Sequence, residues 1–194
     1  MGTLSNGSYL VDIMNEIGYD FATFGNHEFD YGMDVTLSLL EKSNATYLSC
    51  NFMDLKTGKT VAEPYALETY GDLKVAFVGI STPESFTKST PTYFQDENGN
   101  YIYSFCEGND GQDLYDAVQA SIDAAAAEGA DVIIALGHCG VDEQSSPWMS
   151  TEIIANTTGL DAFIDGHSHT VIEGQAVQDQ AGNDVCLLYT SDAA

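Results

Sequence analysis

The sequence contains no arginine and only five lysines, against 30 aspartate and glutamate residues, which gives a formal net charge of -25. A surface of this sign repels nucleic-acid polymers and anionic membranes, so we expect neither as a partner. Without arginine, the chain has no guanidinium group that could clamp a phosphate through two hydrogen bonds. If the substrate carries phosphate, metal cations must supply the positive charge.

Cysteine pairs and long apolar runs are absent as well. The four cysteines are scattered and form no C-x-x-C motif, which argues against a zinc knuckle or a dithiol redox site and leaves small buried thiols as the default. No apolar stretch approaches the roughly 20 residues of a membrane span, and the first residues do not resemble a signal peptide. We therefore expect no membrane-spanning helix, and either a cytoplasmic protein or a native N-terminus that lies upstream.

The apolar residues that are present alternate between helical and strand spacing. They make up 44 % of 194 residues, enough for one domain with a sizeable core. The segments LKVAFVGI and DVIIAL are typical of buried strands, and LYDAVQASIDAAAAE is typical of a helix. The pattern predicts a layered α/β fold. The predicted helices cover residues 9–17, 33–42, 113–128 and 151–156, and the predicted strands cover residues 21–24, 46–50, 73–80, 131–136 and 162–164.

The segment 83–108 interrupts this alternation. It is polar, carries several aromatic side chains and contains a turn pair at Asn98-Gly99. These features predict a long excursion over the surface with a small hairpin, which could lie on the substrate side.

Every histidine of the chain follows a predicted strand, in blocks that read GNHEFD, GHCG and GHSHT. Loops at the carboxyl ends of strands can converge on one crevice in layered α/β folds. One histidine beside a strand is more often a satisfied polar group than a ligand, but four in equivalent places favour a shared site. These histidines are His27, His138, His167 and His169.

The last block contains two histidines as H-x-H. On an extended chain their side chains would point to opposite faces, so both can act as ligands only if a turn brings them together. Gly166, which precedes them, makes such a bend possible.

Together the blocks offer imidazole nitrogens with amide and carboxylate oxygens. This donor set suits Zn, Mn, Fe, Co or Ni better than calcium. Cys139 is the one thiol in the blocks, and we expect it to be structural because its neighbour His138 is the better ligand. A structural zinc site would require four closed, usually cysteine-rich ligands, so the pattern indicates a catalytic site.

The three blocks, in this order and at these separations, resemble the signature of metallophosphoesterases of the calcineurin-like superfamily. The GNHEFDYG form of the first block and the YLSCNF stretch at residues 47–52 are similar to the branch of bacterial 5'-nucleotidases and 2',3'-cyclic-nucleotide 2'-phosphodiesterases. The resemblance spans residues 2–185, and three ordered blocks are far more specific than a single motif.

The resemblance implies a four-layer αββα sandwich with two divalent metal ions bridged by an aspartate. By position in the motifs, Asn26, His138 and His167 would bind one metal and His169 the other. His27 would be the catalytic histidine, with Asp30 as its orienting partner.

The implied reaction is hydrolysis of a small phosphoester, such as a nucleoside 5'-monophosphate or a cyclic nucleotide, by a metal-activated water with assistance from His27. Members of the family are mostly exported, so the resemblance also implies an exported parent protein with a signal peptide upstream. The oligomeric state cannot be predicted from these residues.

The chain departs from the family pattern because it has neither the Asp-x-His block nor the Gly-Asp block with the bridging aspartate. We therefore expect an incomplete sandwich, with a partial catalytic domain at residues 1–185 and no C-terminal nucleotide-recognition domain. Such a chain would hold at most one metal ion well and would hydrolyse phosphoesters poorly or not at all.

The final stretch, CLLYTSDAA at residues 186–194, resembles a translated sequencing adapter, so we expect a non-native tail there.

Two other functions compete with this interpretation. A non-catalytic or degenerate metal-binding fragment agrees with the missing blocks, whereas the intact GNHEFD block favours an enzyme. A Ser-His-Asp hydrolase would need a G-x-S-x-G elbow, which the sequence does not contain.

Overall fold

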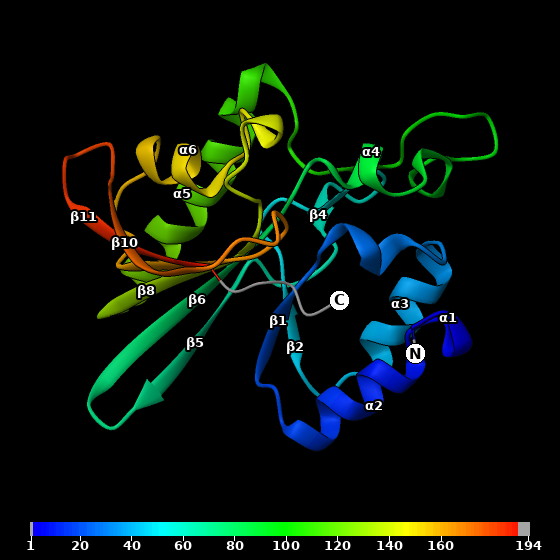
Figure 1. Cartoon of the computed structure of the whole chain (residues 1–194), viewed down its shortest axis with the longest axis horizontal. Helices are drawn as coiled ribbons and strands as arrows, with labels where there is room; N and C mark the ends of the chain where they lie inside the picture. The colour runs from blue at the N-terminus through cyan, green and yellow to red at the C-terminus, as the bar shows by residue number, and fades with distance from the viewer. Residues whose placement is uncertain (1, 190–194) are drawn as a thin grey trace.

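The computed structural model describes residues 2–189, and helices alternate with strands along most of them (Figure 1). The α-helices are α1 (Gly2–Ser5), α2 (Ser8–Ile17), α3 (Met33–Lys42), α4 (Ser85–Lys88), α5 (Gln112–Ala127) and α6 (Ser150–Ala155), and the 3-10 helices are η1 (Asn26–Phe29), η2 (Pro91–Phe94), η3 (Asn109–Gly111) and η4 (Glu143–Ser145). The strands are β1 (Phe21–Thr23), β2 (Thr46–Leu48), β3 (Met53–Asp54), β4 (Lys59–Thr60), β5 (Tyr65–Tyr70), β6 (Leu73–Ser81), β7 (Tyr103–Ser104), β8 (Val132–His138), β9 (Ala162–Asp165), β10 (Ile172–Gln178) and β11 (Asp184–Tyr189).

The elements form layers in the order helix, sheet, sheet, helix (Figure 1). Helix α5 contacts β5, β6 and β8 on the outer face of the larger sheet, and α6 contacts β10. On the inner side, β1 contacts β6 and β8, and helices α2 and α3 lie beyond the β1–β2 pair. The predicted α/β sandwich is therefore the observed fold.

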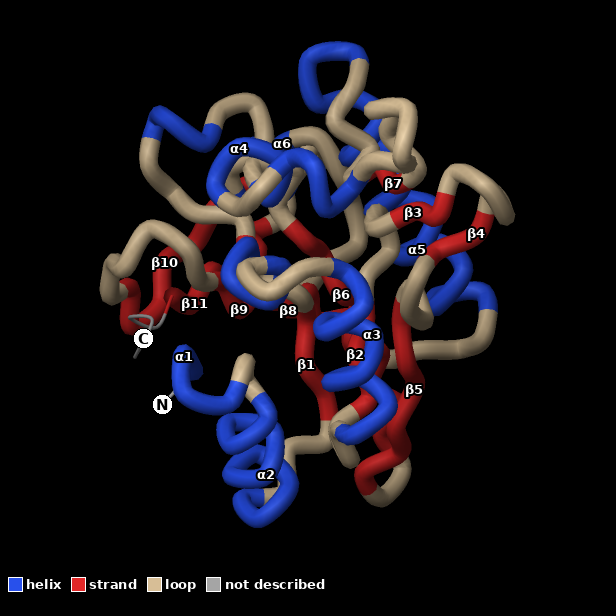
Figure 2. Tube along the Cα trace, turned by 90° about the vertical axis from the view of Figure 1, so that its right-hand side faces the viewer, coloured by secondary structure: helices blue, strands red, loops and turns tan. Residues whose placement is uncertain are grey.

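The larger sheet has the strand order β10-β11-β9-β8-β6-β5, which can be followed across Figure 2. Strands β6, β8, β9 and β11 are parallel, and the outermost strands β5 and β10 are antiparallel to their neighbours. Apolar side chains of β6 and β8 pack against α5 and build the main core. Because the four central strands are parallel, their carboxyl ends lie at one edge of the sheet.

The two sheets meet closely at Gly79 of β6. A Cβ atom at this position would lie 2.1 Å from the backbone oxygen of Leu48 in β2. The Cys50 N–H donates to the Gly79 carbonyl at 2.8 Å, which ties the chain after β2 to the larger sheet. Only glycine permits this approach, so Gly79 sets the distance between the inner layers.

A second core consists of aromatic rings and lies under η1. Phe29 of η1 stacks edge-on against Phe52, Phe94 and Phe105, all fully buried. The excursion 83–108 therefore does more than cross the surface, because it supplies two rings of this core. Its predicted hairpin is present as a bridge between Gln95 and Tyr101.

Most predicted elements are present, and the predicted helix at 33–42 coincides with α3. The sequence prediction omitted the short strands β3, β4 and β7 and the longer strands β5, β10 and β11. Residues 186–189 of the predicted adapter-like tail lie in β11, and residues 190–194 lie outside the described residues. Cys186 is exposed, unlike the buried thiols of Cys50 and Cys139. Within residues 2–189, no helix combines the length and the apolar character needed to cross a membrane.

Candidate metal and phosphoester site

The three histidine-containing blocks meet at one end of the layers. His138 ends β8, the GHSHT block follows the neighbouring strand β9, and η1 follows β1. His138 Nε2 and His167 Nδ1 each lie 3.1 Å from the Asn26 amide oxygen, and the centroids of the two rings are 4.9 Å apart. The structure therefore brings Asn26 together with two histidines that lie more than 100 residues later in the sequence.

The packing of η1 decides which side chains of the GNHEFD block reach the site. Phe24 and Phe29 are fully buried in the aromatic core on either side of the turn, and Asn26 is 4 % exposed. Gly25 is needed next to the site, since a Cβ there would lie 2.9 Å from the His138 ring. With its neighbours buried, His27 is directed outward.

His27 forms a pair with Asp30 on the open side of the block. Its Nδ1 lies 2.8 Å from Asp30 Oδ2, and its side chain is 66 % exposed. A carboxylate only accepts hydrogen bonds, so this contact places a proton on Nδ1 and leaves Nε2 to face solvent.

The turn that carries the H-x-H pair is bent at the histidines themselves. His167 has φ 95° and His169 has φ 54°, whereas Gly166, where the sequence placed the bend, has no positive φ. Non-glycine residues adopt these values only when their surroundings hold them there. Ser168, which lies between the two histidines, holds the turn through two hydrogen bonds. Its Oγ accepts the Val141 N–H at 2.9 Å, and its N–H donates to the Tyr189 hydroxyl.

Asp165 connects the loops that carry His138 and His167. Its carboxylate accepts hydrogen bonds from the N–H groups of Cys139 at 2.7 Å, Gly140 at 3.0 Å and Gly166 at 2.9 Å. Burial raises the pKa of this carboxyl to about 6, and the backbone hydrogen bonds oppose that shift. The sequence analysis missed Asp165, because only its burial in the fold distinguishes it from the many other acidic residues of the chain.

The Cys139 thiol lies fully buried between these loops. Burial raises its pKa well above the ordinary value, which keeps it a neutral thiol. These observations show an enclosed thiol, and the structural role of Cys139 stays a prediction.

Glu84 is a second acidic residue that the sequence analysis missed. It is 7 % exposed, and its Oε2 lies 2.8 Å from His167 Nε2 and accepts the Ser145 hydroxyl at 2.6 Å. Lys88 Nζ lies 3.7 Å from the other carboxylate oxygen. Glu84 therefore contacts His167 on the side opposite Asn26.

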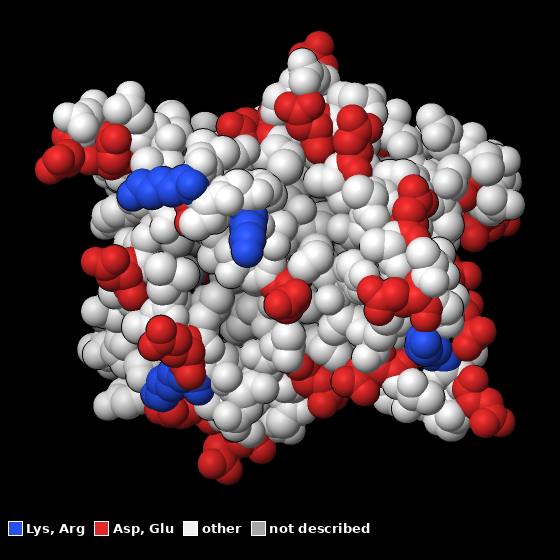
Figure 3. All heavy atoms as spheres, turned by 180° about the vertical axis from the view of Figure 1, so that it is seen from behind, with Lys and Arg blue, Asp and Glu red and all other residues white. Residues whose placement is uncertain are grey.

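A polar cavity of about 230 Å³ opens over these residues. Lys88 is the one lysine among its described lining residues, on a molecule whose visible face in Figure 3 is scattered with acidic side chains. The lining consists of Asn26, His27, Lys88, Asp142, Gln144, Ser145, His167, Ser168 and His169.

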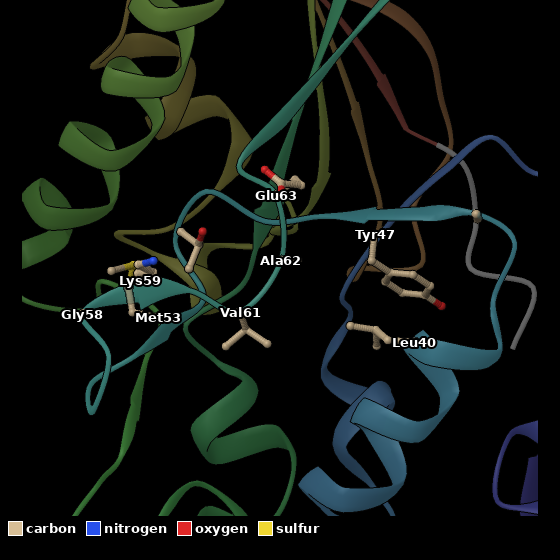
Figure 4. Close-up of a pocket in the computed structure, with 10 residues that line it drawn as sticks. Leu40, Tyr47, Met53, Gly58, Lys59, Val61, Ala62 and Glu63 are labelled. Carbon is tan, nitrogen blue, oxygen red and sulfur yellow. The ribbon is translucent and has the colours of Figure 1, made fainter.

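A larger surface hollow of about 690 Å³ lies elsewhere, beside Tyr47, Lys59 and Val61 (Figure 4). None of the four histidines lines it. The smaller cavity is the candidate site, because it alone among the described cavities contains both His167 and His169.

The Asn26, His138 and His167 donors fit a divalent metal ion. Two ligands bound to one zinc ion at about 2.0–2.1 Å lie about 3.0–3.4 Å apart, which matches their contacts of 3.1 Å. An amide oxygen cannot donate, so a ring nitrogen that faces it with its lone pair gains no hydrogen bond there, and a cation between the two would satisfy both. Within residues 2–189, the His, Cys, Asp and Glu side chains by themselves form no group of three or more that could hold a metal.

Comparison with known families matches residues 3–186 to the family described as bacterial capsule synthesis protein PGA_cap. The trifunctional nucleotide phosphoesterase protein YfkN of Bacillus subtilis is 29 % identical over 82 % of this chain and 11 % of its own length. A 5'-nucleotidase of Vibrio parahaemolyticus is 28 % identical over 80 % of this chain and 27 % of its own length. The chain thus spans 11 to 27 % of the length of these relatives.

Solved structures show the same fold. A 5'-nucleotidase precursor from Thermus thermophilus superposes with a TM-score of 0.76 at 22 % identity and covers 97 % of this chain and 36 % of that one. The calcineurin-like phosphoesterase YfkN from Bacillus subtilis superposes with a TM-score of 0.72 at 25 % identity and covers 94 % and 57 %.

Proposed function

This chain belongs to the PGA_cap family and, with its 5'-nucleotidase and cyclic-nucleotide phosphodiesterase relatives, to the calcineurin-like phosphoesterase superfamily, and from this premise we propose that it carries part of a metal-dependent phosphoesterase site. The observation that carries the proposal is the approach of His138 and His167 to the Asn26 amide oxygen at 3.1 Å. The substrates we propose are nucleoside 5'-monophosphates or cyclic nucleotides.

The proposed roles follow from where each side chain lies. Asn26, His138 and His167 hold one metal ion, and His169, which lines the same cavity, contributes to a second. Divalent metal ions supply a water of lowered pKa and positive charge for phosphoryl oxygens when they are bound. Zn, Mn, Fe, Co and Ni all suit nitrogen and amide donors.

His27 is proposed as the acid that protonates the departing oxygen. Its Nδ1 is held by Asp30 at 2.8 Å, so its Nε2 is the atom available to the substrate. Lys88, 46 % exposed at the cavity, adds positive charge where an anionic substrate would enter.

Substrate choice and location in the cell are properties of the whole protein. Since the chain spans 11 to 27 % of the length of these relatives, we propose that recognition of the nucleotide base depends on a further domain. We also propose that the whole protein is exported, in keeping with the 5'-nucleotidase precursor and the snake venom 5'-nucleotidase among its relatives.

Titration calorimetry with Zn²⁺ tests the metal site in the chain itself. We expect one site per chain, and its loss in His138→Ala. Two tight sites would contradict the partial-site proposal, and the absence of any binding would contradict the metal ligands.

A chimaera tests the reaction. The segment that precedes the matched region in the Bacillus subtilis relative would be joined before Gly2, and phosphate release from 5'-AMP would be measured with Mn²⁺. We expect release that disappears with His138→Ala. If the chimaera binds two metal ions and still releases no phosphate, the alternative of a non-catalytic metal-binding module is correct.

A further inference from the structure

Glu84 stands at the carboxyl end of β6, directly before α4, and its side chain is buried beside the candidate metal site. It is one of only three acidic residues that are buried among the described residues, although the chain has 30 in total. A buried carboxylate costs free energy unless charged or hydrogen-bonding partners compensate it. The partners of Glu84 therefore indicate why it is retained inside.

The carboxylate of Glu84 contacts three side chains, two from distant segments and one a helical turn further along its own segment. Its Oε2 lies 2.8 Å from His167 Nε2 and 2.6 Å from Ser145 Oγ, and its Oε1 lies 3.7 Å from Lys88 Nζ. Its backbone is fixed as well, because the Glu84 N–H donates to the Thr82 hydroxyl at 3.1 Å. The oxygen that faces His167 is thus held in place from both sides.

The contact with His167 fixes the chemistry of the opposite ring nitrogen. An ionised carboxylate only accepts hydrogen bonds, so Nε2 must carry the proton. In the neutral ring the lone pair then lies on Nδ1, and Nδ1 faces the Asn26 oxygen at 3.1 Å. The strained φ of His167 directs the ring into this position, but it leaves the tautomer undetermined.

We propose that Glu84 is a positioning residue that holds His167 as the Nε2–H tautomer and thereby presents Nδ1 to a divalent cation. The inference deepens the proposed function and depends on it for the cation. Carboxylates that accept the second N–H of a metal-binding imidazole orient the ring and raise its basicity. Asp165 holds the backbone of the same loops, so the two buried acids have separate tasks.

Nitrogen-15 NMR of the metal-free chain at pH 8 tests the tautomer without any metal. Long-range proton correlations should show a protonated Nε2 and an unprotonated Nδ1 in His167. A neutral ring with its proton on Nδ1 would overturn the proposal. Because this measurement uses the unaltered chain, it does not depend on whether variants fold.

Zn²⁺ titration of variants tests the consequence for binding. Glu84→Leu removes the acceptor, and we expect Zn²⁺ affinity to fall about 10- to 100-fold with loss of the single tautomer. Glu84→Gln keeps an acceptor oxygen, and we expect the Nε2–H tautomer to return with an intermediate affinity. The matched control Glu97→Gln removes the same charge from an exposed position of the same excursion, and we expect no change.

The outcomes separate this inference from the proposed function. If the unaltered chain binds no Zn²⁺, the metal site is wrong, whatever the tautomer. The other outcome is that the unaltered chain binds Zn²⁺ and the Glu84→Leu variant, shown to be folded by its circular dichroism spectrum, keeps both the Zn²⁺ affinity and the Nε2–H tautomer. That result would overturn the positioning role of Glu84 and leave the metal site standing.

Discussion

His27 illustrates how one residue can be placed for chemistry by its neighbours. Burial of Asn26 and Phe29 on either side leaves its ring in solvent, 2.8 Å from Asp30. In the phosphate-releasing chimaera, we expect His27→Ala to lower turnover by about 10²- to 10⁴-fold, because a general acid is lost. Metal content, measured by atomic emission, should stay unchanged. A large loss of bound metal would instead make His27 a ligand.

Asp165 should give the chain a measurable pH dependence. Its pKa is raised by burial from 3.8 to about 6, so the folded state binds a proton there between about pH 4 and pH 6 while the unfolded state does not. The stability from this proton is present below about pH 4 and is lost as the pH rises through 6. Relative to Asp165→Asn, wild type should lose on the order of 2–3 kcal/mol of unfolding free energy between pH 4 and pH 7.

Urea unfolding of both proteins in EDTA at the two pH values measures this difference. Taking the difference removes the titration of the other acidic groups, which are common to both proteins. An unchanged difference across the window would mean that Asp165 is already ionised in the folded protein at pH 4.

The histidines could be found from sequence, but their supporting acids could not. Histidine is rare here, so four copies at strand ends are conspicuous. Glu84 and Asp165 are two acidic residues among 30, and only the fold distinguishes them by burying them. The bend at His167 also depends on contacts of Ser168 with a distant strand, which no local pattern records.

At the scale of elements, the closeness of β2 and β6 depends on a single glycine. Gly79 has an ordinary extended backbone, so the cost of a side chain there is purely steric: its Cβ would lie 2.1 Å from the Leu48 oxygen. We expect Gly79→Ala to lower the free energy of unfolding by about 3 kcal/mol, because the layers must separate.

Gly174→Ala in β10 is the matched control, since a Cβ there meets nothing within 4 Å. Urea unfolding followed by circular dichroism compares the two variants. Equal stability of both would show that the layers adjust freely at Gly79.

Two of the missed strands, β5 and β10, differ in burial from the elements that the sequence predicted. Strand β6 is buried along most of its length, β8 has no exposed position, and α3 has a clear apolar face, so their patterns are strong. Strand β10 is exposed at most positions, and β5 is exposed toward its end. Both are edge strands whose pairing depends on the neighbouring strand, and a local pattern cannot record a partner distant in sequence.

At the scale of the whole molecule, the site lies where the two sheets and the 83–108 excursion meet, on a strongly acidic surface. With 30 acidic residues and five lysines, repulsion between like charges opposes the compact state. The site partly offsets this by placing Lys88 at the cavity. A metal cation would add to that local positive charge.

The charge predicts that salt stabilises this protein. Screening shortens the range of repulsion from about 30 Å at 0.01 M to about 10 Å at 0.1 M ionic strength, so less repulsion remains between neighbouring carboxylates. We expect the midpoint of thermal unfolding, measured in EDTA, to rise by several degrees when NaCl increases tenfold over this range. Choline chloride at equal ionic strength should give the same rise, since screening does not depend on the cation. A rise with NaCl alone would indicate a specific sodium site, and a constant or falling midpoint would show that repulsion does not limit the stability of the fold.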